Sequence, residues 1–421
     1  MEDKLESKPL VRVLIVDDSK AVRSMVNRWL SHEPSIRVVS EAEDGYQALT
    51  ASKVYDPDVV VLDVEMPGIS GIEALKKIRA YDPDKIVIMF SATTHKGAAA
   101  TIEALSMGAA DYVTKPTSDK GVELTRLDLV SKILALGTQR RRSRVVNPAN
   151  RFGAPPTLKE KLLDKEGFSK TPVDASKRSK VYRRDHGQKE TDTNATNKVS
   201  TSLNGATSAA KISSLPKSKS EAVVIASSTG GPAALSEVIP KLPLDLKVPI
   251  LIVQHMPPLF AEMLAERLDG RCPLEVKIAE ENDRVRPGVV YIAPGGRHLE
   301  VERKGVHEVV CHLSDNPPEQ SCRPSANVLF RSAASVWRKQ LLGVVLTGMG
   351  ADGCEGSRLI VEGGGTVIIQ DEATSVIWGM PGAVAKAGYA SAQFPLDQIA
   401  KEIYLNTKIS DRLVEARLGN K

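Results

Sequence analysis

The sequence predicts an α/β protein made of two doubly wound parallel-sheet domains joined by a long disordered linker. Short apolar runs alternate with helix-patterned segments over residues 10–137 and again over residues 221–410, as in parallel sheets covered on both faces. Residues 138–220 lack that periodicity. The chain has 421 residues, of which 42% are apolar and only 4% aromatic, and this balance favours α/β architecture over an all-β sandwich.

The first domain, residues 10–137, is expected to contain five strands alternating with helices. Runs of β-branched and aliphatic residues predict strands, and apolar residues spaced three or four apart predict helices. The expected strands are 11–18, 36–42, 58–64, 85–92 and 110–116, and the expected helices are 21–30, 72–80, 98–108 and 124–136.

Residues 138–220 are expected to form a basic disordered linker. The segment carries 19 Lys and Arg against 7 Asp and Glu, a net charge of +12, which leaves −7 for the rest of the chain. Its polar composition buries too little apolar surface to offset chain entropy. Three roles stay open: a solvated tether, docking to acidic protein tails or anionic membranes, and sequence-independent DNA binding. No helix-turn-helix or aromatic-stacking pattern supports the last role, so no nucleic-acid partner is expected.

The second domain, residues 221–410, repeats the alternation of strands and helices. The expected strands are 222–227, 249–255, 289–294, 307–313, 342–348, 365–370 and 389–394. The expected helices are 233–242, 259–268, 325–337 and 353–364. These elements again predict a doubly wound parallel sheet.

The composition also bears on location. The first ten residues mix charges and contain no apolar signal-peptide core, and no run reaches the ~18 apolar residues of a membrane span. The four cysteines show no metal-type pairing, which fits reduced thiols. We therefore expect a cytoplasmic protein without membrane insertion.

Polar residues follow the apolar strands of the first domain. Asp17 and Asp18 end the first strand, Asp63 ends the third, Ser91 ends the fourth and Lys115 follows the fifth. The carboxyl ends of parallel strands meet at one edge of a sheet, where ligands bind. Converging carboxylates repel one another unless a hard cation such as Mg²⁺ neutralises them. Together with a lysine and a hydroxyl, they predict a pocket for a phosphoryl group.

The first domain resembles the response-regulator receiver family, whose fold is flavodoxin-like. The matching motifs are "DD" at 17–18, "LDVEMPGISG" at 62–71, "SAT" at 91–93 and "DYVTKP" at 111–116. The resemblance implies that Asp63 accepts a phosphoryl group from a histidine kinase. It also implies that Asp17, Asp18 and Asp63 hold Mg²⁺ with the backbone carbonyl of Glu65.

The same resemblance assigns the rest of that pocket. Lys115 would pair with the phosphoryl group, and the Lys115–Pro116 bond would be cis. Ser91 and Tyr112 would move on phosphorylation and reshape the face beside the fourth and fifth strands.

The second domain places hydrolase-type residues at strand ends. The stretch "SSTGG", which includes Ser228, follows the first strand, His255 follows the second, and Asp352 lies in the glycine-rich loop "TGMGADG". A nucleophile, a base and an orienting carboxylate need this convergence. A phosphate-binding loop in a binding module is the alternative for "SSTGG", but the P-loop lysine and the G-x-G-x-x-G pattern are absent. His298 is interpreted as a turn residue that faces solvent.

The second domain resembles the catalytic domain of chemotaxis protein-glutamate methylesterases, so a Rossmann-like fold is expected. The matching blocks are "ASSTGGP", "VQHMPP", "YIAPGGRH", "CRPSANVLF", "LTGMGADG" and "WGMPGAV". The resemblance implies that Ser228 is the nucleophile, His255 the base and Asp352 the residue that orients it. It also implies supporting roles for three residues. The backbone N–H of Met349 would help to stabilise the oxyanion, Thr229 would support the site, and Arg323 would contact the substrate.

The two resemblances together imply a phosphorylation-activated hydrolase. It would remove methyl esters from glutamates of methyl-accepting chemotaxis receptors and deamidate their glutamines, during adaptation in chemotaxis. Its partners would be a chemotaxis histidine kinase and the receptors, and its catalytic domain would need no cofactor.

Overall fold

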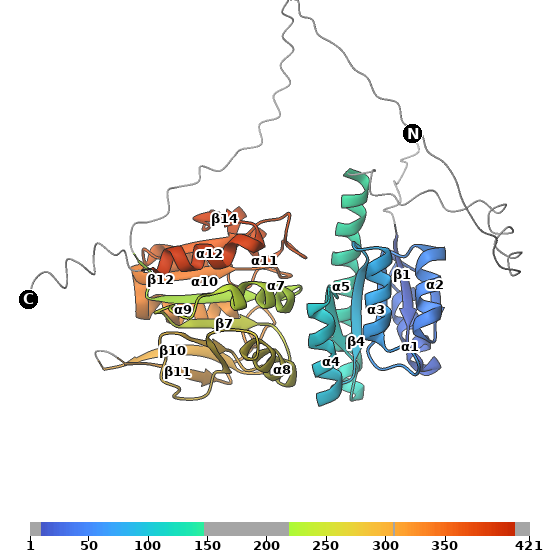
Figure 1. Ribbon diagram of the computed structural model, residues 1–421, viewed down its shortest axis with the longest axis horizontal. Helices are drawn as coiled ribbons and strands as arrows, with labels where there is room; N and C mark the ends of the chain where they lie inside the picture. The colour runs from blue at the N-terminus through green and yellow to red at the C-terminus, as the bar shows by residue number, and fades with distance from the viewer. Residues whose placement is uncertain (1–9, 147–218, 306–307, 409–421) are drawn as a thin grey trace, which may run out of the picture. The chain divides into compact units, whose positions relative to one another are not determined.

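The structure is a computed structural model, and it describes residues 10–146, 219–305 and 308–408. The first domain runs from blue to green and the second from green to red in Figure 1. Most of the linker predicted at 138–220 lies outside the described residues. Each domain is described by itself below.

The first domain is a parallel sheet with helices on both faces. Its five strands lie in the order β2-β1-β3-β4-β5, which is the flavodoxin-like order that the sequence predicts. The strands are β1 (Val11–Val16), β2 (Ile36–Ala42), β3 (Val59–Asp63), β4 (Ile86–Ser91) and β5 (Asp111–Thr114). The helices are α1 (Lys20–Ser31), α2 (Gly45–Tyr55), α3 (Gly71–Tyr81), α4 (His95–Ser106) and α5 (Asp119–Val146). Helix α2 was not among the predicted helices.

Side-chain caps explain where these helices begin. Ser19, Asp44 and Thr94 each accept a hydrogen bond from a backbone N–H in the first turn of the helix that follows. Ser70 and Glu73 form a reciprocal capping box at the start of α3. Each of these helices therefore starts directly after a strand-end loop that carries polar residues.

Helix α5 continues past residue 137, where the sequence analysis places the start of the linker. Arg140 donates to Asp82 at 2.6 Å, and Arg141 lies 3.3 Å from Asp58. Both aspartates lie at the amino-terminal edge of the sheet. The local composition suggests a linker, but these ion pairs hold the helix against the domain as far as Arg141, and the helix itself extends to Val146.

The second domain is built on a seven-stranded parallel sheet in the order β14-β13-β12-β6-β7-β9-β8. Its strands are β6 (Ala222–Ser227), β7 (Ile250–Gln254), β8 (Glu275–Ile278), β9 (Val289–Ile292), β12 (Leu341–Val345), β13 (Thr366–Gln370) and β14 (Ala392–Phe394). A separate antiparallel pair, β10 (His298–Lys304) and β11 (Glu308–Ser314), stands apart from this sheet in Figure 1. The doubly wound sheet is confirmed, whereas β8 and β10 were not predicted.

Helices cover both faces of the second sheet. The α-helices are α7 (Gly231–Val238), α8 (Pro258–Asp269), α9 (Ala326–Trp337), α10 (Cys354–Glu362), α11 (Met380–Lys386) and α12 (Leu396–Thr407). Two short 3₁₀ turns, Ile239–Lys241 and Arg338–Gln340, follow α7 and α9. The sequence analysis did not predict α11 and α12. No helix in the described part of the chain is long and apolar enough to cross a membrane.

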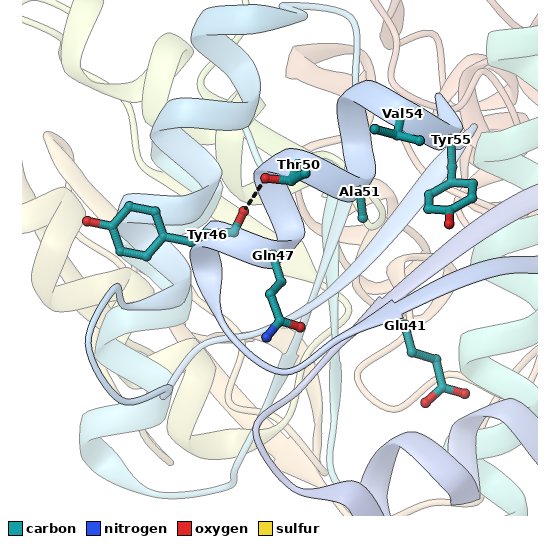
Figure 2. Close-up of a pocket in the computed structure, with 7 residues that line it drawn as sticks. All are labelled: Glu41, Tyr46, Gln47, Thr50, Ala51, Val54 and Tyr55. Atoms are coloured by element: carbon teal, nitrogen blue, oxygen red, sulfur yellow. Dashed lines mark hydrogen bonds between the residues drawn. The ribbon is translucent and has the colours of Figure 1, made fainter. Parts of the chain in front are cut away.

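A hollow of about 410 Å³ lies beside α2, and Figure 2 shows the side chains that line it. Thr50 Oγ1 donates to the carbonyl oxygen of Tyr46 at 3.0 Å within it. The lining contains none of the acidic residues predicted for the phosphoryl pocket. The hollow is therefore distinct from both candidate sites.

Candidate active site and phosphoryl pocket

The acidic residues of the first domain meet at the carboxyl edge of its sheet. Oxygen atoms of Asp17, Asp18 and Asp63 all lie within 4.8 Å of one another. Lys115 Nζ lies 2.8 Å from Asp17 Oδ2 and 2.9 Å from Asp63 Oδ1. The structure thus brings four of the predicted residues together between the ends of β1, β3 and β5.

The Asp63 carboxyl group is buried in this cluster. Burial raises its pKa to about 6, although the hydrogen bond from Lys115 lowers it in part. A divalent cation would favour the ionised form, and a set of carboxylate oxygens suits a hard cation. The donors therefore fit the metal that the sequence analysis predicts. Glu65 contributes a backbone N–H 3.4 Å from Asp63 Oδ1.

The two predicted switch residues lie on neighbouring strands. Ser91 ends β4, and its hydroxyl lies 3.2 Å from the carbonyl oxygen of Ala92 and 3.1 Å from that of Gly97. Tyr112 lies on β5, where it pairs in register with Met89 of β4. In this state the Ser91 hydroxyl therefore bonds to backbone near the start of α4.

The expectation of a cis Lys115–Pro116 bond is wrong for this structure. Within the described residues, the cis peptide bond is Arg323–Pro324 in the second domain. The trans form is the lower-energy state of an X–Pro bond by about 0.5–1 kcal/mol.

The three candidate catalytic residues of the second domain follow neighbouring strands. Ser228 follows β6, His255 follows β7, and Asp352 lies in the loop after β12. Strand β6 lies between β12 and β7, and the later strands extend to opposite sides of it. Ligands bind at such a switch point, outside the carboxyl ends of the strands.

His255 and Asp352 form a direct hydrogen bond. The distance from His255 Nε2 to Asp352 Oδ2 is 2.7 Å. An ionised carboxylate only accepts hydrogen bonds, so Nε2 carries the proton and Nδ1 is left to accept one. The pair therefore presents an oriented base at the edge of the sheet.

The start of α9 fixes the Asp352 carboxylate. Oδ1 accepts from Ser325 Oγ at 2.8 Å and from the Asn327 N–H at 3.0 Å, and Oδ2 accepts from the Ala326 N–H at 2.7 Å. Burial alone would raise the pKa of Asp352. The hydrogen bonds from His255 and from the backbone outweigh burial and lower it, so the carboxylate stays ionised.

The same contacts act on His255 in the opposite direction. Burial lowers the pKa of its imidazole, but hydrogen bonds to Asp352 and Cys322 outweigh burial and raise the pKa to about 9. The negative charge of Asp352 thus stabilises the imidazolium that forms when His255 takes a proton. The Cys322 Sγ atom lies 3.7 Å from His255 Nδ1.

Buried polar contacts position the backbone of Ser228. Its N–H donates to the Thr347 carbonyl at 3.1 Å, and its own carbonyl accepts from Gln254 Nε2 at 3.0 Å. Ser227 Oγ donates to Gln254 Oε1 at 2.7 Å, inside the sheet. No hydrogen bond from Ser228 Oγ to His255 is recorded among the described residues, and such catalytic bonds often tighten only when substrate is bound.

Two backbone N–H groups beside Ser228 are free to bind an oxyanion. In the described part of the chain, neither the Thr229 N–H nor the Met349 N–H donates a hydrogen bond to another protein atom. The loop after β12, which carries Met349, passes close to Ser228. A Cβ at Gly348 of this loop would lie only 2.9 Å from the Ser228 Cβ, so a glycine there permits the close approach. Thr347 Oγ1 donates to the Thr229 carbonyl at 2.9 Å and so links the two loops.

A hollow of about 380 Å³ opens beside His255. Its lining is His255, Met256, Pro257, Pro258, Gly296, Ser321, Cys322, Arg323 and Pro324. The predicted substrate residue Arg323 thus lies at its wall, with its guanidinium 3.0 Å from the Asp315 carbonyl and 3.2 Å from that of Asn316. Its contact with substrate stays a prediction.

His298 is fully buried, so its interpretation as a solvent-facing turn residue is wrong. It begins β10, its Nδ1 accepts from the Ser325 N–H at 3.2 Å, and its Nε2 lies 3.2 Å from the Pro317 carbonyl. It braces the segment that carries Ser325. The glycines before it suggested a turn, but the pairing of β10 with β11 encloses the ring.

The sequence reasoning missed four residues that build this site: Gln254, Cys322, Ser325 and Asn327. Gln254 carried a signal, since it is a polar residue that ends an apolar strand. The other three precede or begin α9, and their sequence gives no indication that this helix would meet the loop of Asp352.

Comparisons with known proteins agree with the two-domain architecture. Residues 13–125 match the model of the response regulator receiver domain, and residues 223–403 match that of the CheB methylesterase. The chain is therefore a response regulator with a methylesterase-type output domain.

Two similar proteins match nearly the whole chain, and one solved structure matches its second domain. It is 43% identical to protein-glutamate methylesterase/protein-glutamine glutaminase 2 of Caulobacter vibrioides, over 93% of this chain and 98% of that one. It is 41% identical to protein-glutamate methylesterase/protein-glutamine glutaminase of Trichodesmium erythraeum, over 94% of this chain and 98% of that one. The crystal structure of the Thermotoga maritima CheB methylesterase catalytic domain is 41% identical, covers 44% of this chain and 98% of that chain, and gives a TM-score of 0.43. The chain belongs to the protein-glutamate methylesterase/protein-glutamine glutaminase family.

Proposed function

We propose that this chain is a phosphorylation-activated protein-glutamate methylesterase and protein-glutamine glutaminase, with Ser228, His255 and Asp352 as its catalytic residues. The main observation in support of this site is the 2.7 Å hydrogen bond from His255 Nε2 to Asp352 Oδ2, which leaves Nδ1 to act as the base. The substrates are methyl-esterified glutamates and glutamines of chemotaxis receptors.

The first half of the reaction forms an acyl-enzyme. Ser228 Oγ attacks the ester carbonyl carbon while its proton passes to His255 Nδ1. The N–H groups of Thr229 and Met349 stabilise the oxyanion, an effect of ~3–4 kcal/mol for one donor. The bond to the methoxy oxygen breaks, and His255 returns the proton so that methanol leaves.

The second half releases the product. Water attacks the acyl carbon, and its proton passes to His255 Nδ1. The bond to Ser228 Oγ breaks, the serine regains its proton, and a receptor glutamate is left. A glutamine side chain passes through the same acyl-enzyme with ammonia as the leaving group. Arg323 contacts the substrate at the wall of the hollow beside His255.

The first domain regulates this activity. Asp63 accepts a phosphoryl group from a chemotaxis histidine kinase, and Lys115 pairs with that group. Asp17, Asp18, Asp63 and the Glu65 backbone carbonyl would hold Mg²⁺, which would neutralise the negative charge of that group. Ser91 and Tyr112 then move, and the domain ceases to restrain the hydrolase. We place the protein in the cytoplasm, where both partners would be accessible to it.

Methanol release from methylated receptor membranes, with and without a small phosphodonor, tests this function. We expect release to rise with the phosphodonor and to be lost in Ser228→Ala. A serine-reactive ester analogue should label the wild type and the Ser236→Ala control but not Ser228→Ala. If no methanol is released and no label is taken up, "SSTGG" is a binding loop and the proposal fails.

A further inference from the structure

Cys322 contacts Nδ1 of His255, the ring nitrogen that is not bonded to Asp352. Its Sγ atom is 3.7 Å from His255 Nδ1, and it lines the same hollow of about 380 Å³. The mechanism above gives this thiol no task. Oxygen, nitrogen and sulfur atoms of Asp352, His255 and Cys322 all lie within 4.8 Å of one another.

The sulfur and nitrogen are joined by a hydrogen bond in this structure, and their separation is also close to that of two ligands on one metal ion. Tetrahedral zinc lies at ~2.3 Å from sulfur and ~2.0–2.1 Å from imidazole nitrogen, which puts the two ligands about 3.5 Å apart. The 3.7 Å between Cys322 Sγ and His255 Nδ1 needs only a small adjustment. A thiolate and an imidazole favour zinc over magnesium or calcium.

Asp352 supports this arrangement from the other side of the imidazole. Metal-binding histidines commonly donate their second N–H to a carboxylate, which fixes the ring and raises its basicity. His255 Nε2 makes that bond at 2.7 Å. The Asp352 oxygens already accept from Ser325, Ala326 and Asn327, so the carboxylate orients the ring and is not needed as a ligand.

We propose that Cys322 and His255 form a zinc-binding site that inhibits the hydrolase. Binding places the ion on Nδ1 and on the Cys322 thiolate, and both the thiol proton and the Nδ1 proton of the imidazolium pass to solvent. Water completes the coordination from the open hollow. Nδ1 can then no longer take the Ser228 proton, so acylation stops until the ion is removed. The inhibition rests on the proposed function, whereas the metal site does not.

Cobalt(II), a spectroscopic stand-in for zinc, tests the site without reference to activity. The full chain is reduced, saturated with Mg²⁺ so that the carboxylate cluster is occupied, and titrated with Co²⁺. We expect a thiolate-to-cobalt charge-transfer band in the wild type and in the Cys272→Ser and Cys354→Ser controls, and none in Cys322→Ala. The proposal is overturned if the wild type gives no such band, or if Cys322→Ala retains it.

Zinc titration of methanol release tests the inhibition. Each rate is divided by the zinc-free rate of the same variant, so a change in basal activity does not affect the comparison. We expect reversible loss of wild-type activity, restored by a zinc chelator, and at least tenfold more zinc for half-inhibition of Cys322→Ala. Equal sensitivity of the two proteins overturns the inhibitory role. If no methanol is released by any variant, the proposed function fails and the cobalt band alone decides the metal site.

Discussion

Asp352 Oδ2 accepts a 2.7 Å hydrogen bond from His255 Nε2, and Asp352 is 2% exposed. This bond determines which imidazole nitrogen carries the proton. It also leaves Nδ1, not Nε2, as the nitrogen that would serve Ser228 in the proposed mechanism. The contact joins residues that are far apart in the sequence, because β12 and β7 flank β6 in the sheet.

Asp352→Asn should lower kcat by about 10⁴-fold, a loss of the size known for buried triad aspartates. An asparagine amide can donate to Nε2, which would put the proton on Nδ1 and abolish the base. Methanol release under saturating substrate measures the effect. The exposed Asp397→Asn serves as the control and should match the wild type. A loss of less than tenfold in Asp352→Asn would remove Asp352 from the mechanism.

The pH dependence of kcat/KM should report the His255 imidazole. The base must be neutral to accept a proton, and its pKa is raised to about 9, so activity should increase as pH rises towards 9. The Cys322 contact contributes to that raised pKa, so Cys322→Ala should move the midpoint to lower pH. The profiles are measured with a zinc-selective chelator present, and Cys354→Ala is the control. An unchanged midpoint in Cys322→Ala would contradict the assignment.

The sequence pattern was sufficient for the two parallel sheets and for placing Ser228, His255 and Asp352 at strand ends. Apolar runs bounded by polar residues mark where a buried strand emerges, and parallel strands emerge at one edge. The pattern could not show that Ser325 braces Asp352, or that His298 braces the segment that carries Ser325. Their roles depend on how β10 and α9 pack, which is a matter of tertiary contact. The extension of α5 was missed for the same reason, since Arg140 resembles a linker residue until its partner Asp82 is seen.

Ser325→Ala should reduce kcat by roughly tenfold or more, because a hydrogen bond to a charged group contributes about 1.5–3 kcal/mol. Ser325 acts through Asp352 and does not touch the substrate, so KM should stay unchanged. The pKa read from the pH profile should fall as Asp352 orients His255 less well. Ser335→Ala, on the outer face of the same helix, is the matched control. A change in KM alone would contradict the positioning role.

Asp63→Asn should abolish stimulation of methanol release by a small phosphodonor, because we propose the Asp63 carboxylate as the phosphoryl acceptor. The exposed Asp84→Asn lies in the same domain and should respond like the wild type. Measuring the ratio of rates with and without phosphodonor separates regulation from basal activity. Stimulation that persists in Asp63→Asn would show that phosphorylation acts elsewhere.

Arg140→Ala should destabilise the first domain, because it removes one of the two cations that pair with the buried Asp82 carboxylate. Arg140 donates to Asp82 at 2.6 Å, and the fully buried Lys85 lies 3.2 Å from the same carboxylate and 2.9 Å from Asp56. Removing one member of a buried pair costs about 3–5 kcal/mol. Because Lys85 still pairs with Asp82, we expect the low end of about 3 kcal/mol, which corresponds to a fall of roughly 10 °C in unfolding temperature. Calorimetry of the full chain measures the transition of this domain. Arg126→Ala, which removes a more exposed ion pair on the same helix, should shift that transition far less. If the two variants shift it equally, Arg140 does not anchor the end of α5.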